Sequence, residues 1–356
     1  MTRPSVDTMV RSSIAKMTLY ASNREPCALD LSDNTNQRGA PPSARAVVPQ
    51  TNVDLFARYP SHYAADLKGA IAAHLGVGQD EVVTGCGSDD VLDSAIRAFA
   101  NAGGALAYPD PTFAMVPYFA RVNDLEPRPV PLLGADRGYD VDAEGLLAAR
   151  ASITYLCSPN NPTGTRVSKG AMERILAEAS GIVLLDEAYV EYCGDSLVRR
   201  AKSDGRLLVV RTFSKAFGLA GARVGYAVGA PELVQAVEKS RGPYKVTALA
   251  EQVTIAALQN DSAWVEGGVR DVLAAREKFV AFLERRNIVS IPSSANFVLV
   301  PVKDAAGQAK ALRQRGVAVR PFPNLLGIGD ALRISIAPWE LLEPALPSFE
   351  EVLSCV

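Results

Sequence analysis

The chain has 356 residues, of which 48% are hydrophobic and 21% charged, a composition typical of a soluble globular protein with about two domains. Its formal net charge of −2 gives no broad attraction to nucleic acid, and no apolar run approaches the roughly 18 residues of a membrane span. The first residues carry no apolar signal segment, so we expect a cytoplasmic protein with neither nucleic-acid nor membrane partners.

Residues 1–50 lack sustained periodicity and contain three prolines, Pro41, Pro42 and Pro49, which predicts an extended N-terminal arm. Residues 51–255 are predicted to form a large domain, in which helical patterns alternate with short apolar runs from about residue 60. The predicted helices are Ala64–Leu75, Asp89–Ala100 and one that Ser168 caps. The predicted strands are Glu81–Thr84, Ala105–Tyr108, Ile153–Cys157, Ile182–Leu185, Leu207–Val210 and Val224–Val228. Apolar strands separated by helices indicate an α/β fold with a mostly parallel sheet that helices cover on both faces.

The pattern becomes more helical after Pro231, and residues 256–356 are predicted to form a smaller α+β domain. A long helix is expected over about Ala263–Arg286, and the residues expected on its inner side are Val265, Val269, Val272, Phe279 and Leu283. Asn296–Val300 and Leu332–Ile336 are predicted strands.

The cysteines and histidines argue against several other chemistries. The chain has five cysteines and no Cys-x-x-Cys, so we expect neither a disulfide framework nor a metal site. It has only two histidines, His62 and His74, and His74 falls on a predicted helix as a packing or surface residue. A Ser-His-Asp hydrolase is therefore poorly supported.

Lys215 directly follows a predicted buried strand, in the segment Arg211-Thr-Phe-Ser-Lys-Ala-Phe-Gly218. Burial at such a position lowers the pKa of a lysine and frees its amine to form a Schiff base. Thr212, Ser214 and Arg223 add hydroxyls and a guanidinium, which suit a phosphate. These neighbours favour a functional lysine over a solvated loop lysine.

Asp186 ends another predicted strand, and a carboxylate at the carboxyl end of a parallel strand faces the ligand crevice of an α/β sheet. Such a carboxylate can keep a pyridine nitrogen protonated, so that the ring withdraws electrons. Tyr189, three residues further on, can donate to a ring oxygen. Considered alone, Asp186 is equally compatible with a helix cap or a metal ligand.

Two loops at strand ends offer further polar groups. Gly85-Cys-Gly-Ser-Asp-Asp90 lies between a strand and a helix, where free backbone N–H groups can bind phosphate. Asp90 occupies the position of the last glycine of a dinucleotide fingerprint, which argues against a nicotinamide-dependent dehydrogenase. Ser158–Gly164 is a tight loop that offers the amide of Asn161 to the crevice.

Together, Asn160-Asn-Pro-Thr-Gly164, Asp186-x-x-Tyr189 and Ser214-Lys215, with Arg223 eight positions later, resemble the fold-type I, class I/II aminotransferases. Within that family the chain is most similar to the histidinol-phosphate aminotransferase subgroup. The supporting stretches are Arg58-Tyr-Pro60, Gly87-Ser-Asp-Asp90, Ile96-Arg-Ala-Phe99 and Leu332-Arg-Ile-Ser335. The resemblance covers nearly the whole chain and implies a seven-stranded sheet in the large domain.

The resemblance implies a pyridoxal 5′-phosphate cofactor and a role for each residue around it. Lys215 would carry the cofactor as a Schiff base and later move a proton at the substrate, while Asp186 would pair with the pyridine nitrogen. The remaining cofactor contacts would be ring contacts from Phe113, Asn161 and Tyr189, and phosphate contacts from Ser88, Asp89, Thr212, Ser214 and Arg223. Tyr59 would reach the phosphate of a neighbouring subunit, which implies a homodimer with shared active sites.

The resemblance also implies a small-molecule amino donor and a 2-oxo acid as partners, bound by Tyr20, Asn34, Arg320 and Arg333. The subgroup's motif Asn-Glu-Asn-Pro-x-Gly here reads Asn34-Thr-Asn-Gln-Arg-Gly39, with Thr35 in place of the acid and Gln37 in place of the proline. The first expectation is transamination between histidinol phosphate and 2-oxoglutarate. An aromatic amino-acid aminotransferase and a threonine-phosphate decarboxylase of the same subgroup stay open, and the sequence leaves the exact amino donor undetermined.

Overall fold

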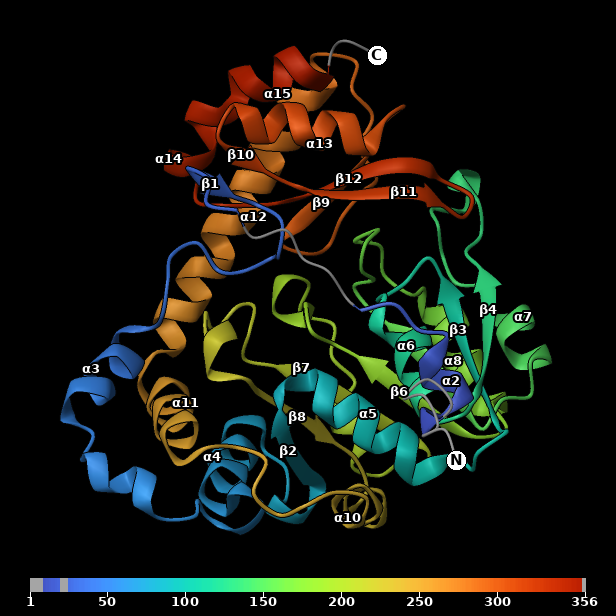
Figure 1. The fold of residues 1–356 in the computed structure, drawn as a ribbon, viewed down its shortest axis with the longest axis vertical. Coiled ribbons are helices and arrows are strands. Elements are labelled where there is room, and N and C mark those ends of the chain that lie inside the picture. The colour runs from blue at the N-terminus through green and yellow to red at the C-terminus, as the bar shows by residue number, and fades with distance from the viewer. Residues whose placement is uncertain (1–8, 20–24, 354–356) are drawn as a thin grey trace, which may run out of the picture.

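A seven-stranded sheet forms the centre of the larger part of the molecule in the computed structural model, which describes residues 9–19 and 25–353 (Figure 1). The strands, in spatial order, are β2 (Val82–Cys86), β8 (Val224–Val228), β7 (Leu207–Thr212), β6 (Ile182–Asp186), β5 (Ile153–Cys157), β3 (Ala105–Asp110) and β4 (Glu126–Pro131). Only β8 runs antiparallel to its neighbours. The predicted mostly parallel sheet is therefore confirmed.

Strand β4 is the one strand of this sheet that the periodicity did not predict. Its sequence, Glu126-Pro-Arg-Pro-Val-Pro131, contains three prolines, each of which lacks an N–H to donate. The strand lies at the edge of the sheet and pairs only with β3. An edge strand needs hydrogen bonds on one side alone, so the prolines are tolerated there.

Alternate residues of the central strands point into two separate cores. Leu208 and Val210 of β7 pack with α5 (Gly87–Phe99), α6 (Met115–Val122) and α10 (Pro231–Lys239) on one face. Leu207 and Val209 belong to the core of the opposite face. Helices α4 (Ala65–Leu75), α7 (Ala143–Ala148), α8 (Lys169–Glu178) and α9 (Val198–Ala201) contribute to that second core. Burial on both faces explains why the strands are continuous apolar runs.

A second, antiparallel sheet has the order β11 (Arg320–Leu325), β12 (Gly329–Ser335), β9 (Phe297–Pro301). Helices α13 (Ala305–Gln314), α14 (Trp339–Leu342) and α15 (Leu346–Leu353) accompany it. The long α12 (Ser262–Glu284) runs from the large part of the molecule to this sheet (Figure 1). Val265, Val272, Phe279 and Leu283 are buried on α12 as expected, whereas Val269 is only partly buried.

The prediction of an extended N-terminal arm is wrong for part of its length. The arm contains α2 (Ser12–Ala15), β1 (Leu29–Asp30) and α3 (Pro42–Gln50), and β1 pairs in parallel with β10 (Val317–Ala318). Pro42 opens α3, where no intrahelical N–H is needed, whereas Pro49 lies inside the helix, one residue before its end. A proline at the first helical position is compatible with a helix, and α3 continues for only one residue beyond Pro49.

The predicted boundary at residue 255 falls inside α11 (Ala248–Asn260). This helix packs against α3 and α4, which belong to the large part of the molecule. We therefore propose that the large domain extends to the end of α11 and that the small domain starts with α12.

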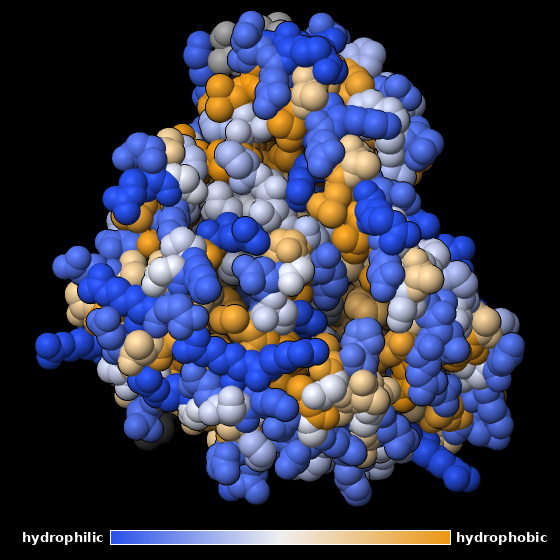
Figure 2. Space-filling model, turned by 180° about the vertical axis from the view of Figure 1, so that it is seen from behind, coloured by the Kyte–Doolittle hydropathy of each residue, from blue (hydrophilic) through white to orange (hydrophobic). Residues whose placement is uncertain are grey.

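The face shown in Figure 2 is mostly covered by hydrophilic residues, with hydrophobic residues visible in smaller groups between them. Within residues 9–19 and 25–353, no helix is long and apolar enough to cross a membrane. The same residues contain no cluster of His, Cys, Asp or Glu that could hold a metal ion. Four cysteines, Cys27, Cys86, Cys157 and Cys193, are free thiols, and Cys355 lies outside the described residues.

Candidate active site

A cavity of roughly 710 Å³ collects most of the residues that the sequence singled out. It lies at the carboxyl ends of β5, β6 and β7, where ligands of open α/β sheets bind, and the small sheet contributes to its wall. The predicted residues that line it are Asn34, Ser88, Asp89, Phe113, Asn161, Asp186, Tyr189, Thr212, Ser214, Lys215, Arg223, Arg320 and Arg333. Tyr59 does not line it, and Tyr20 lies outside the described residues.

Lys215 enters the cavity from the turn that follows β7. Its Nζ donates a hydrogen bond to the carbonyl oxygen of Asp33 at 3.0 Å and lies 5.8 Å from the centre of the Tyr189 ring. Burial and, next, the positive charge of Arg333 lower the pKa of Lys215 to about 8. A substantial fraction of this amine is therefore neutral, and so nucleophilic, in mildly alkaline solution.

Asp186 ends β6 and is buried at the floor of the cavity. Its Oδ1 accepts a hydrogen bond from the Ala188 amide and its Oδ2 accepts one from the Tyr155 hydroxyl, both at 2.9 Å. Burial raises the pKa of Asp186 to about 6, and these two hydrogen bonds oppose the rise. The carboxylate is therefore mainly ionised at pH 7, as a partner for a protonated ring nitrogen must be.

Tyr155 is a functional neighbour that the sequence analysis missed. It is fully buried in the middle of β5, where the apolar pattern made it one more core residue. A buried tyrosine hydroxyl nearly always has a hydrogen-bond partner. This requirement indicates that Tyr155 has a polar partner, but it does not identify that partner as Asp186 on the adjacent strand.

A hydrogen-bonded group surrounds the Tyr189 hydroxyl. Asn34 donates to it from Nδ2 at 3.0 Å, and Ser335 Oγ donates to Asn34 Oδ1 at 2.8 Å. Asn34 is buried and has a positive φ of 55°, a conformation that asparagine adopts more readily than most residues. The direct contact of Asn34 is thus with Tyr189, and its predicted role in substrate binding stays a prediction. Asn161 accepts a hydrogen bond from Arg333 Nη1 at 2.6 Å.

Another group of residues in the cavity offers donors that suit a phosphate. The first turn of α5 supplies the backbone N–H groups of Ser88 and Asp89, and β7 and its turn supply the hydroxyls of Thr212 and Ser214. Two glycines make this approach possible. A Cβ on Gly225 would lie 2.2 Å from the Ser88 nitrogen, and one on Gly87 would lie 2.5 Å from the Arg223 guanidinium.

Arg223 completes this cradle with a guanidinium that lies 3.3 Å from the Asp89 carboxylate. Because hydroxyls, backbone N–H groups and a guanidinium converge where a side chain would not fit, the residues present match a phosphate dianion.

Arg320 and Arg333 lie directly opposite each other on the antiparallel strands β11 and β12. Arg333 is buried, and its guanidinium lies 5.5 Å and 5.6 Å from the ring centres of Phe297 and Phe322. Like charges directly opposite on two strands destabilise a sheet, and a bound anion reduces that repulsion. The pair therefore suits a phosphate or carboxylate of a substrate.

Tyr59 lies at the surface, 81% exposed, and stacks on Tyr244 with the ring centres 4.7 Å apart. A position outside the cavity of its own chain is what a residue that acts on a neighbouring subunit requires, but its predicted role is untested.

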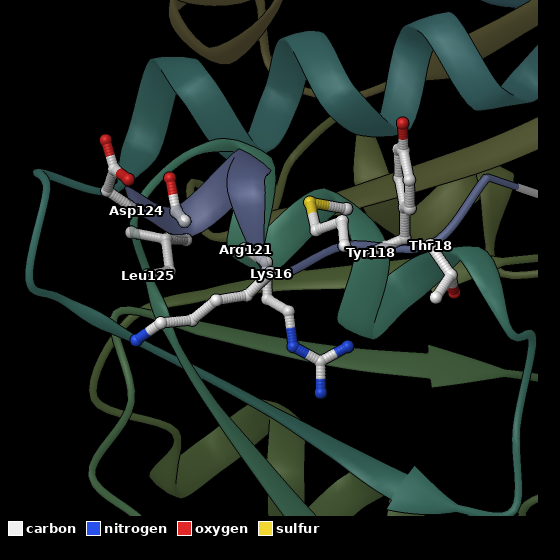
Figure 3. Close-up of a pocket in the computed structure, with 8 residues that line it drawn as sticks. Lys16, Thr18, Tyr118, Arg121, Asp124 and Leu125 are labelled. Carbon is white, nitrogen blue, oxygen red and sulfur yellow. The ribbon is translucent and has the colours of Figure 1, made fainter. Parts of the chain in front are cut away.

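A second cavity, of roughly 670 Å³, lies next to the first, and Tyr118 lines both. It lies between residues 13–18 and the outer side of α6 (Figure 3). Lys16 and Arg121 both line this cavity, and their side chains point in different directions in Figure 3. Arg11 anchors the segment through hydrogen bonds of 2.7 Å to the Val122 carbonyl and to Asp124.

The model of one protein family, aminotransferase class I and II, matches residues 27–346. The chain belongs to this family. As a class I and II aminotransferase it is a pyridoxal-phosphate enzyme, and the cavity has a group for each part of that cofactor: an amine, a carboxylate and a phosphate cradle.

Individual relatives have two kinds of name. This aminotransferase is 37% identical to histidinol-phosphate aminotransferase 1 of Cupriavidus pinatubonensis, with 86% of this chain and 83% of that protein covered. It is 36% identical to an aromatic amino acid aminotransferase of Corynebacterium efficiens, with 89% and 93% covered. Its fold matches the crystal structure of histidinol-phosphate aminotransferase from Sinorhizobium meliloti in complex with pyridoxal-5′-phosphate, with a TM-score of 0.85, 26% identity, and 97% and 98% covered.

Proposed function

We propose that this aminotransferase moves an amino group between histidinol phosphate and 2-oxoglutarate. The observation that carries the proposal is the cross-strand pair Arg320 and Arg333, which presents two guanidiniums to the cavity that contains Lys215. The name of the Cupriavidus pinatubonensis relative supports histidinol phosphate as the amino donor.

The residues of the chain have distinct tasks in this proposal. Pyridoxal phosphate, when bound, supplies a ring that withdraws electrons from the substrate's α-carbon. Lys215 would hold the cofactor and, as a neutral amine, would take the proton from that carbon, which its low pKa favours. Asp186 would keep the ring nitrogen protonated, and Ser88, Ser214 and Arg223 would hold the phosphate in place.

The two arginines bind the charged group of each substrate in turn. A guanidinium binds a phosphate or carboxylate through two parallel hydrogen bonds, a geometry that lysine does not reproduce. The phosphate dianion of histidinol phosphate engages both Arg320 and Arg333, and glutamate reuses them for its carboxylates.

A second candidate is an aromatic amino acid as the donor. Besides Tyr189, three aromatic side chains, Phe113, Tyr118 and Phe322, line the cavity, and Thr35 stands there in place of the acid of the subgroup motif. A threonine cannot pair with a positively charged imidazole ring. The Corynebacterium efficiens relative has the corresponding name.

A substrate panel distinguishes these candidates. The purified enzyme is given 2-oxoglutarate with histidinol phosphate, phenylalanine, tyrosine or threonine phosphate, and glutamate formation is measured beside carbon dioxide release. We expect kcat/KM for histidinol phosphate to exceed that for phenylalanine by about tenfold or more, as one well-placed charged contact provides. A higher value for phenylalanine or tyrosine overturns the donor, and stoichiometric carbon dioxide release overturns transamination itself.

We also propose a homodimer with shared active sites. The exposed Tyr59 follows an exposed apolar stretch in which Val53 is 74% and Phe56 66% exposed. A second copy of the chain would cover this stretch and receive Tyr59 at its phosphate cradle. Exposed apolar side chains that lie close together are typical of interaction surfaces.

A further inference from the structure

Asp90, the residue that occupies the last glycine position of a dinucleotide fingerprint, lies beneath the phosphate cradle. It belongs to α5 and follows Ser88 and Asp89 directly. Its Oδ2 accepts hydrogen bonds from the Cys86 amide at 3.0 Å and from Arg241 Nη1 at 3.1 Å. Asp90 therefore closes the strand-to-helix turn by binding the amide that precedes the helix.

Arg241 holds Asp90 from inside the protein. Its side chain is only 1% exposed and also donates to the Glu238 carboxylate at 3.0 Å and to the Thr84 carbonyl. A Cβ on Gly85 would lie 2.6 Å from Asp90 Oδ2 and 2.9 Å from Arg241 Nη1. The ion pair thus fills the space directly under the turn, which explains why position 85 is a glycine.

The segment that follows Arg241 supports the loop of Tyr59. Lys245 Nζ lies 3.6 Å from Asp90 Oδ1, and the ring of Tyr244 stacks on Tyr59. Tyr244 is itself held by a hydrogen bond of 2.6 Å between its hydroxyl and His62 Nε2. The amide of Tyr63 donates to the Pro243 carbonyl at 2.9 Å. One ion-paired cluster therefore connects the first turn of α5 with the surface on which Tyr59 lies.

We propose that Asp90 and Arg241 are positioning residues for the cofactor phosphate. They fix the first turn of α5 so that the N–H groups of Ser88 and Asp89 face the phosphate, and they anchor the segment that carries Tyr244. The inference rests on the proposed cofactor site.

The direction in which Asp90→Asn changes the affinity for the phosphate distinguishes this positioning role from a purely electrostatic one. Asp90 brings a negative charge close to a bound dianion, so Coulomb's law alone predicts that Asp90→Asn binds the phosphate more tightly. Loss of positioning predicts the opposite, because the substitution breaks the ion pair with a buried guanidinium and loosens the turn.

The test uses the apoenzyme and two ligands, pyridoxal phosphate and pyridoxal, which lacks the phosphate. Dissociation constants are measured by absorbance and protein fluorescence for the wild type, Asp90→Asn, Asp90→Glu and Asp93→Asn. Asp93→Asn is the matched control, because it removes the same charge from the same helix, where Asp93 pairs with Arg97 instead. We expect Asp90→Asn to weaken the binding of pyridoxal phosphate about tenfold, as loss of one charged contact predicts, and to leave the binding of pyridoxal unchanged. Asp90→Glu should recover part of the affinity, and Asp93→Asn should match the wild type.

Two outcomes overturn the inference: unchanged or tighter binding of pyridoxal phosphate by Asp90→Asn, or equal weakening of both ligands, which a general loss of structure would cause. If Asp90→Asn does not fold, the same ligand comparison is made with Arg241→Lys, which keeps the charge but cannot reach Asp90, Glu238 and the Thr84 carbonyl at once. A wild-type protein that binds pyridoxal and pyridoxal phosphate equally well would overturn the proposed cofactor site, a result visible before any variant is made.

Discussion

Lys215 and Asp186 have opposite pKa shifts with a common first cause. Burial disfavours the charged form of each group, so it lowers the pKa of Lys215 to about 8 and raises that of Asp186 to about 6. Between these two values the carboxylate is mainly ionised while the amine is still mostly protonated. As the pH rises through about 8, the lysine becomes a nucleophile without any change in Asp186.

The reactivity of the apoenzyme should report the pKa of Lys215. We expect the rate of borohydride-trappable attachment of pyridoxal phosphate to rise with pH through a midpoint near 8, well below the value of an ordinary lysine. Peptide mapping should place the label on Lys215, and Lys215→Ala should abolish it. Removal of the positive charge in Arg333→Met should move the midpoint upward. A label on another lysine, or a midpoint near 10, contradicts the assignment.

The Tyr155 hydroxyl should lower the pKa of Asp186. In Tyr155→Phe the carboxylate loses one hydrogen bond that favours its ionised form, so the pKa of Asp186 should rise further. Because the ionised carboxylate is the active form, the acid limb of the kcat/KM profile should move to higher pH by about one unit, given about 1.4 kcal/mol per unit. Tyr108→Phe is the control, since Tyr108 is a buried tyrosine of β3 that is not bonded to Asp186. If the acid limb of the kcat/KM profile does not move, Tyr155 does not influence the pKa of Asp186.

Within the small sheet, the pairing of β11 with β12 brings Arg320 and Arg333 together, although they are thirteen positions apart along the chain (333 − 320). A one-residue shift in register would turn one of the two side chains to the opposite face of the sheet. The sheet therefore acts as a scaffold that presents two guanidiniums at one side of the cavity.

The two arginines should differ in the half-reactions that they affect. Arg333→Ala should slow both half-reactions about 10-fold to 100-fold, because one or two charged hydrogen bonds to the substrate are lost. Arg320→Ala should impair the dianionic phosphorylated donor more than glutamate. Each half-reaction is followed separately by the absorbance change of the bound cofactor, and Arg333→Lys serves as the charge-preserving control. If Arg333→Ala changes neither half-reaction, the arginine has a structural role alone.

For the whole molecule, the exposed Tyr59 makes the proposed homodimer testable by complementation. Lys215→Ala inactivates the active site of its own chain. If Tyr59 acts across the interface, Tyr59→Ala instead impairs the active site of the partner chain. In a mixed dimer, one site then has an intact Lys215 from one chain and an intact Tyr59 from the other.

Equal mixing of refolded or co-expressed variants should therefore give about a quarter of the wild-type activity, since about half of the dimers are mixed and each has one intact site. The parent Tyr59→Ala dimer should stay assembled in sedimentation experiments and bind pyridoxal phosphate more weakly. A mixture no more active than the sum of its parents contradicts the shared site, as does a fully active monomer.

The strand ends and the polar residues at them could be predicted from the amino-acid sequence. Lys215 and Asp186 could be identified because a short apolar run and the polar residue that ends it are local features, and most of the parallel strands lie within one or two residues of their predicted limits. The family motifs added the phosphate cradle around Ser88 and Arg223, which the cavity brings together.

Other features depend on how distant segments of the chain pack together. Whether a proline is tolerated depends on its position, which is a sheet edge for β4 and the first residue for α3. No local pattern shows which strand lies at the edge of the sheet. The bond between Tyr155 and Asp186 depends on which strands are neighbours, and the pair of Asp90 with Arg241 joins residues 151 positions apart. Such contacts arise from the packing of distant segments, whereas sequence periodicity records only which face of an element is apolar.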